Sequence, residues 1–216
     1  MLKFANVEKD IFETKYKRIL CPCCGKMVHI PLHKYSTGFD FNYSVLINSV
    51  EEFFDLVDLC PECGYVMLFD NGISEEMQVY ITSDEYRNII MNDEIEEGLK
   101  KWMLLAILSE YDENYTEAGI AYTKAYDYLE IKEMELDKKL IEKAASCFLS
   151  AADEYASFVD AILAVDAMRR DGEMEQAKRF LEIITETFHG ELVDKLTWKE
   201  HMWIDLNITE KRFLDI

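Results

Sequence analysis

The sequence predicts a mixed α+β chain, in which a small β domain over residues 1–88 precedes an all-α domain over residues 89–216. Two stretches in the first part, Cys-Pro-Cys-Cys-Gly at 21–25 and Cys-Pro-Glu-Cys-Gly at 60–64, are typical of tight turns. From Ser83 onward the apolar residues recur with the period of an amphipathic helix, about 3.6 residues. Gly (8) and Pro (3) are scarce, which argues against a chain built mainly of strands and turns.

Short apolar stretches flank both turns and predict the strands of the first domain. Tyr16–Leu20 leads into the first turn, Met27–Leu32 leaves it, and Tyr65–Phe69 follows the second turn. Between the turns, Asp40–Leu46 predicts a further strand, and Ser49–Asp58 fits either a short helix or a strand. The first domain is therefore expected to be a small β structure organised by its two turns.

The second domain is predicted to be a series of helices. Ser83, followed by two acids, supplies an N-cap hydroxyl and the negative charges that a first helical turn prefers. Polar or glycine-containing turns at 112–114, at 171–172 and at Gly190 separate later helices. The expected helices after the boundary region span residues 94–110, 114–130, 133–157, 159–171, 173–188 and 191–206.

The cysteines of the two turns form a metal-ligand pattern. Two CPxCG turns, with 35 residues between Cys24 and Cys60, supply four thiols, the set that holds Zn²⁺ in structural sites. In such a turn the glycine follows the second ligand, so Gly25 assigns Cys24, and not Cys23, as a ligand. The sequence therefore predicts one structural Zn²⁺ in a zinc-ribbon-like domain. The predicted ligands are Cys21, Cys24, Cys60 and Cys63.

Other reactive side chains give no catalytic pattern. His29 and His33 lie near the first turn, but four thiols already close a tetrahedral site, so we expect both histidines at the surface or in contact with a ligand residue, and not bound to the metal. Cys147 lies on an apolar helix face and is expected in the core. The sequence contains no phosphate-binding Gly-rich loop, HExxH or GxSxG motif. We therefore predict a protein that is not an enzyme, with unrecognised catalytic residues as the alternative.

The formal net charge is −20, and the charges are unevenly distributed. Residues 35–86 contain no Lys or Arg and eleven Asp or Glu. Such a chain repels nucleic acid phosphates over most of its surface and favours a basic partner. The exception is a basic patch around the first CxxC pair. Its members are Lys15, Lys17, Arg18, Lys26 and Lys34.

The sequence also indicates a cytoplasmic protein. Its longest apolar stretches, such as Met103–Leu108, are far shorter than a membrane span. The first ten residues carry acids where a signal peptide needs its apolar run. Paired CxxC motifs fit a reducing compartment, where thiolates bind metals and do not form disulfides.

The helical part resembles a tetratricopeptide repeat, a helix pair with large and small residues at set positions. Residues 102–125 carry this pattern, and residues 164–184 carry a weaker copy. Equivalent residues Ala118 and Ala177 lie 59 positions apart, so the segment 136–158 must supply an extra, long helix. An ordinary helical bundle with alanines at the helix crossings is the alternative. The matching residues are Trp102, Leu105, Ala106, Ala118, Tyr122 and Ala125, and then Ala164, Val165, Ala177, Leu181 and Ile184.

The order of these features resembles an uncharacterised bacterial family, a domain of unknown function with an N-terminal CPxCG zinc ribbon and tetratricopeptide-like C-terminal helices. The resemblance rests on residues 16–25, on residues 60–65 and on the stretch 164–172. It implies the two-part architecture and a bacterial, cytoplasmic setting. It implies no activity.

Three functions are consistent with these features. The first is a non-enzymatic adaptor, in which zinc organises the N-terminal domain and stacked helices bind a protein or peptide, favouring a basic one. The second is a nucleic-acid-associated factor that uses the basic patch, although the acidic charge makes nucleic acid an unfavourable partner. The third is a redox-regulated chaperone, because Cys23 adds a further thiol beside the predicted ligands.

Overall fold

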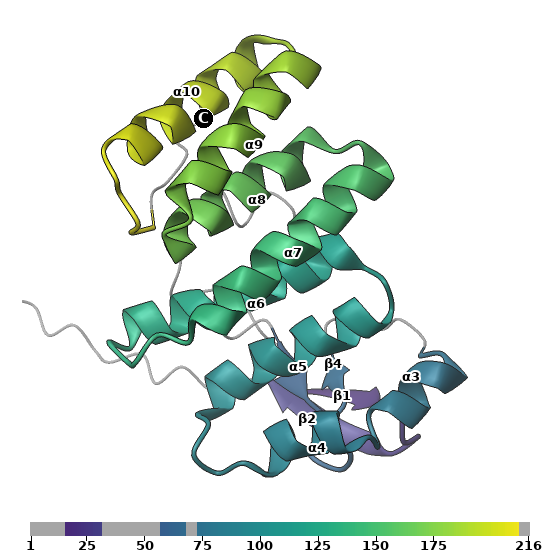
Figure 1. Cartoon of the computed structure of the whole chain (residues 1–216). Coiled ribbons are helices and arrows are strands. Elements are labelled where there is room, and N and C mark those ends of the chain that lie inside the picture. Colours follow the sequence, from purple (N-terminus) through teal and green to yellow (C-terminus); the bar gives the residue numbers. More distant parts are fainter. Residues whose placement is uncertain (1–15, 32–56, 68–72, 212–216) are drawn as a thin grey trace, which may run out of the picture.

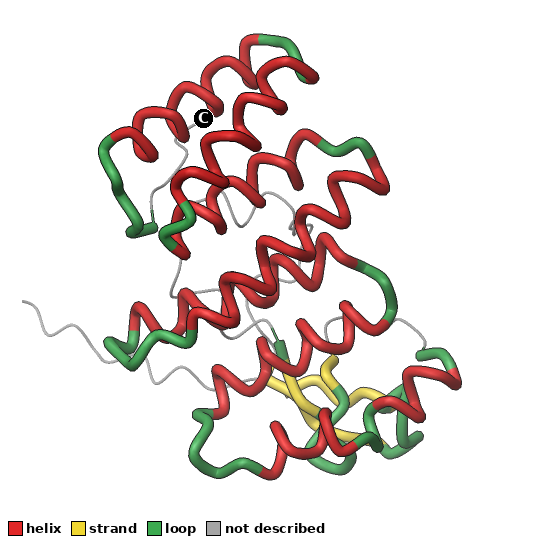
Figure 2. Tube along the Cα trace, in the orientation of Figure 1, coloured by secondary structure: helices red, strands yellow, loops and turns green. Residues whose placement is uncertain are grey.

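The computed structural model describes residues 16–31, 57–67 and 73–211 (Figure 1). Two small antiparallel sheets lie at one end of the molecule, and a stack of helices extends away from them (Figures 1 and 2). The described chain is mostly helical with a minor β part, which confirms the mixed α+β prediction. The predicted segments 40–46 and 49–58 lie wholly or largely outside the described residues.

The β part consists of two hairpins of the same design. They are β1 (Tyr16–Leu20) with β2 (Met27–Pro31), and β3 (Asp58–Leu59) with β4 (Val66–Met67). In each hairpin a CPxCG turn begins the connection between the strands, which runs over residues 21–26 in one and 60–65 in the other. Strands were predicted at both turns, and the last two residues of the predicted strand 65–69 lie outside the described residues.

Two short helices, α3 (Glu75–Tyr80) and α4 (Asp84–Met91), follow the hairpins. Ser74 and Ser83 cap them by accepting hydrogen bonds from the amides of Met77 and Tyr86, at 3.1 and 3.3 Å. The Ser83 cap was predicted, whereas α3 was not. The predicted domain division at residue 88 falls within α4, and the division itself stays a prediction.

Six longer helices form the stack. They are α5 (Glu97–Tyr111), α6 (Tyr115–Ile131), α7 (Lys138–Tyr155), α8 (Phe158–Asp171), α9 (Met174–Thr187) and α10 (Glu191–Asp205). Each packs against the next one along the chain, and α8 also contacts α10. All six agree with the predicted ranges to within a few residues, and α7 is the extra helix that the 59-residue spacing required.

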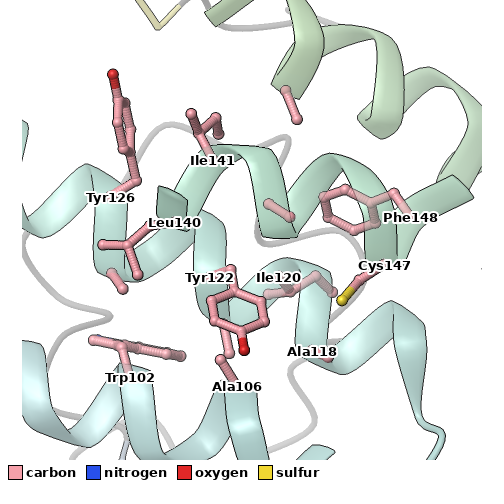
Figure 3. Packing of buried hydrophobic residues seen from close by; sticks show 14 of the residues in the cluster. Trp102, Ala106, Ala118, Ile120, Tyr122, Tyr126, Leu140, Ile141, Cys147 and Phe148 are labelled. Atoms are coloured by element: carbon pink, nitrogen blue, oxygen red, sulfur yellow. The ribbon is translucent and has the colours of Figure 1, made fainter. Parts of the chain in front are cut away.

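Small residues allow these helices to approach closely. Ala106 on α5 and Ala118 on α6 are both fully buried, and Ala106 lies between the rings of Trp102 and Tyr122 in the core (Figure 3). On the other face of α6, a Cβ atom at Gly119 would lie 2.7 Å from ring atoms of Phe148 on α7. Real Cβ contacts are longer than this, so the α6–α7 contact requires glycine at position 119.

Four helix ends, those of α5, α6, α8 and α10, share one backbone arrangement, as α5 and α8 illustrate. After α5, Glu113 has a left-handed backbone (φ 59°), and the Asn114 amide donates to the Ser109 carbonyl at 2.9 Å. After α8, Gly172 is left-handed (φ 95°), and the Glu173 amide donates to the Met168 carbonyl at 2.9 Å. This is the Schellman arrangement, which satisfies carbonyls at the helix end and turns the chain back.

A buried ion pair fixes α8 against α6. The Arg170 guanidinium donates to Asp127 and to Glu130 at 2.7 Å each. Asp127 is only 1% exposed, and Arg170 lowers its pKa to about 2 despite the opposing effect of burial. Removing Asp127 or Arg170 would leave the other buried charge with fewer opposite charges around it, which is destabilising.

We expect Gly119→Ala to destabilise the chain by about 1–3 kcal/mol. Alanine would gain up to about 1 kcal/mol of helix propensity, but the overpacking against the buried Phe148 ring outweighs that gain. Thermal unfolding followed by circular dichroism measures the change.

The double variant Gly119→Ala/Phe148→Leu is the control, because the smaller side chain leaves room for the new methyl group. The cost of Gly119→Ala should shrink or reverse sign in the Phe148→Leu background. An equal cost in both backgrounds would show that the helix contact is not the cause.

Candidate metal centre

The two hairpins bring the four predicted ligand cysteines together. Their four Sγ atoms all lie within 4.8 Å of one another. The Sγ atoms of Cys21 and Cys63 are 3.8 Å apart, as are those of Cys24 and Cys60. With Zn–S bonds of about 2.3 Å, the edges of a tetrahedral site are about 3.8 Å, so these two pairs fit opposite edges around one ion. All six cysteines of the chain are free thiols, so no disulfide competes for these sulfur atoms.

The turns repeat the same backbone geometry. The Gly25 amide donates to the Cys21 carbonyl at 3.0 Å, and the Gly64 amide donates to the Cys60 carbonyl at 2.8 Å. Both glycines have a left-handed backbone, with φ of 67° and 76°. Other residues adopt this conformation only at a cost, which explains why the sequence places glycine after each second cysteine.

Burial sets the electrostatics of the cluster. Cys21 is fully buried, and burial raises the pKa of its thiol to about 11. Backbone hydrogen bonds from Cys24 and Cys23 oppose this rise. Burial likewise raises the pKa of Cys63, against a backbone hydrogen bond from Tyr65. A bound cation would reverse this balance, because it stabilises thiolates directly.

At Cys24 the balance differs. Burial is the largest single effect and raises the pKa of the Cys24 thiol, but a backbone hydrogen bond from Lys26 and the neighbouring thiols together outweigh it, so the pKa is lowered. Backbone amides in both turns thus donate to the cysteine sulfur atoms and favour their thiolate forms against the effect of burial.

The other candidate residues lie outside this group of four. Cys23 is half-buried beside the cluster, and burial raises the pKa of its thiol. His29 is exposed on β2, as expected, and His33 lies outside the described residues. Cys147 is buried in the helical core, which confirms its predicted position.

The predicted basic patch is partly neutralised. Lys26 forms an ion pair with Glu62, which links the first turn to the second across the surface. Arg18 is exposed on β1. Lys15 and Lys34 lie outside the described residues, so the extent of the patch stays a prediction. The exposed ion pair between Lys26 and Glu62 adds little stability, typically below about 1 kcal/mol.

The helices hold the second hairpin through buried polar contacts. Tyr86 of α4 is fully buried, and its hydroxyl donates to the Gly64 carbonyl at 3.0 Å. Asp58 of β3 lies 3.8 Å from Lys101 of α5 in an ion pair. Lys100 of α5 donates to the Ile90 carbonyl at the end of α4, at 3.1 Å. The hairpin carrying Cys60 and Cys63 is thus fixed to the helical stack.

Sequence reasoning did not identify Tyr86 as part of this site. Its hydroxyl reaches the turn only because α4 folds back over the second hairpin, and no spacing in the sequence encodes that contact. The available signal was the Ser83 cap, which places Tyr86 on the first turn of a helix soon after the second CPxCG turn.

The chain was compared with family models, curated proteins and solved structures, and none of them matches. Among the described residues, no helix is both long enough and apolar enough to cross a membrane.

We expect Tyr86→Phe to destabilise the N-terminal part by about 1–2 kcal/mol, because the Gly64 carbonyl loses its donor inside the protein. The measurement is thermal unfolding together with metal retention against a chelator. Tyr80→Phe is the matched control, because the Tyr80 hydroxyl donates to the carboxylate of Glu85 at an exposed position. Equal effects of the two substitutions would argue against a role for the buried bond.

Proposed function

We propose that this chain is a zinc-binding adaptor. Cys21, Cys24, Cys60 and Cys63 hold one structural Zn²⁺ that joins the two hairpins, and the helical stack presents a surface to a partner protein. The observation that carries the proposal is the convergence of four thiols from two distant turns, all within 4.8 Å. The proposed family is the bacterial group with a zinc ribbon and tetratricopeptide-like helices, and the proposed setting is the cytoplasm.

The donor set favours zinc over the other common ions. Four sulfur ligands at tetrahedral spacing suit Zn²⁺ or iron, whereas Mg²⁺ and Ca²⁺ require oxygen ligands. Four protein ligands also leave no open position for a substrate, as is usual in structural sites. When bound, the ion supplies cross-linking of the hairpins and does not supply a reaction.

Matching positions support a tetratricopeptide-like reading of the helices. The left-handed residues Glu113 and Gly172 are 59 positions apart, the same spacing as Ala118 and Ala177. Each left-handed residue lies five positions before its alanine, and both alanines are fully buried. In this reading α5–α6 and α8–α9 are two repeat units, and α7 is inserted between them.

The zinc half of the proposal predicts about one Zn²⁺ per chain in protein purified under reducing conditions. Cys60→Ser should lose the ion and melt the N-terminal hairpins, while most of the helical circular dichroism signal remains. Elemental analysis distinguishes zinc from iron, and cobalt substitution should give the visible bands of tetrahedral thiolate coordination.

Cys23→Ser is the matched control for this experiment, because Cys23 lies in the same turn but outside the group of four. It should keep the ion. Reduced wild-type protein that binds no metal, or a Cys23→Ser variant that loses it as Cys60→Ser does, would refute the assignment.

The proposed adaptor role predicts that the chain binds a stable protein partner with a basic contact surface. Affinity-tagged full-length chain, chemically cross-linked in host cells, should give cross-links between lysines of α5–α10 and one recurrent partner. An unrelated acidic protein of similar size, tagged in the same way, is the control for charge alone. Cross-links no more specific than those of that control would contradict this half.

A further inference from the structure

The segment that follows α10 returns to the helical stack and binds there. We call residues 206–211 the C-terminal segment. Its Asn207 has a left-handed backbone (φ 54°), and the Ile208 amide donates to the Trp203 carbonyl at 2.9 Å. Ile208 packs against the core. The chain then continues without helix or strand through Lys211.

Arg169 of α8 holds the backbone of this segment. One guanidinium nitrogen, Nη1, donates to the Ile208 carbonyl at 2.7 Å and to the Glu210 carbonyl at 3.0 Å. The side chain is fully buried, and its Nε donates to Glu200 at 2.9 Å. Its Nη2 donates to Asp166, and its guanidinium lies 5.1 Å from the Trp203 ring centroid. Contacts with Glu200, Asp166 and Trp203 therefore position the guanidinium independently of its contacts with the segment.

A second anchor lies on α6. Lys211 forms an ion pair and hydrogen bond with Asp127, a residue 84 positions earlier in the chain. Asp127 is buried and also accepts from Arg170. The segment thus reaches from α10 across α8 to α6, and a buried carboxylate receives its lysine. Charge-assisted bonds of this kind are about twice as strong as neutral ones.

We propose that Asp127 and Arg169, with the core surface that receives Ile208, form a peptide-binding surface, and that the C-terminal segment occupies it in the isolated chain. The inference rests on the adaptor function and names its partner class. That class is an extended segment with an apolar residue three positions before a lysine or arginine, matching Ile208 and Lys211. Within the segment, Arg169 contacts the backbone carbonyls of Ile208 and Glu210, a backbone contact that any peptide can form.

The chain's own segment competes strongly for this surface. A short covalent connection gives it an effective concentration on the order of millimolar, so a partner of moderate affinity binds only when the segment is released. The net charge of −20 additionally attracts a basic partner. The same contacts would be formed by the partner in place of the segment.

The test uses the zinc-loaded full-length chain and a fluorescent synthetic peptide with the sequence of residues 206–211 and blocked ends. In Lys211→Glu the chain's own segment is repelled from Asp127, so the peptide should bind about 10-fold or more tightly than to wild type, as expected for losing a buried charge contact. Fluorescence anisotropy measures binding. A peptide with glutamate in place of its lysine should bind neither chain.

Lys195→Glu is the matched control, because it makes the same charge change at an exposed position of α10. It should bind the peptide no better than wild type. Hydrogen exchange of the amides in residues 206–211 gives an independent measure, and it should be faster in Lys211→Glu than in Lys195→Glu.

Faster exchange in Lys211→Glu without peptide binding would overturn the proposal, because the segment would then only pack against the end of α10 and would not occupy a binding surface. Unchanged exchange would overturn it too, since Lys211 would not hold the segment. If Lys211→Glu fails to fold, Lys211→Ala replaces it, and unfolding of both would show that the segment belongs to the fold. Zinc content and partner cross-links are scored separately, so this inference can fail while the adaptor function stands.

Discussion

The arrangement of the N-terminal hairpins depends on four cysteine sulfur atoms that lie close together. A two-stranded hairpin is marginally stable in water by itself, and β3 and β4 contain only two residues each. These hairpins have a few buried side chains between them, among them Val28, Val57 and Val66. What they share is the cluster of four thiols at 3.8 Å along two edges. Because both turns present their cysteines from the same backbone geometry, a single ion can bind to both hairpins at once.

The helical stack depends on a different principle, close contact between neighbouring helices. Buried alanines at 106, 118 and 177 and the glycine at 119 let the backbones approach. Schellman turns at the ends of α5 and α8 then reverse the chain within a few residues. The two parts are joined by contacts on α4 and α5, so the metal centre and the stack are not independent: the Tyr86 hydroxyl bonds directly to a turn that carries two cysteines.

Local features were readable from the sequence, and distant contacts were not. Gly25 and Gly64 identified which cysteines come together, because the turn requires a left-handed residue after the second thiol. The helices from α5 onward followed from their period and their turn residues. The contacts of Tyr86 with Gly64 and of Lys211 with Asp127 depend on how helices pack, and a sequence without its fold contains no spacing that predicts them. The short helix α3 was missed because six residues give too little periodicity.

Arg169 and Arg170 are consecutive on α8 and turn in opposite directions, one toward α10 and the other toward α6. A shift or rotation of α8 by one residue would separate both guanidinium groups from their carboxylate partners at the same time. The register of α8 is therefore set from two sides, and the helix can move along its axis only with the loss of both buried ion pairs.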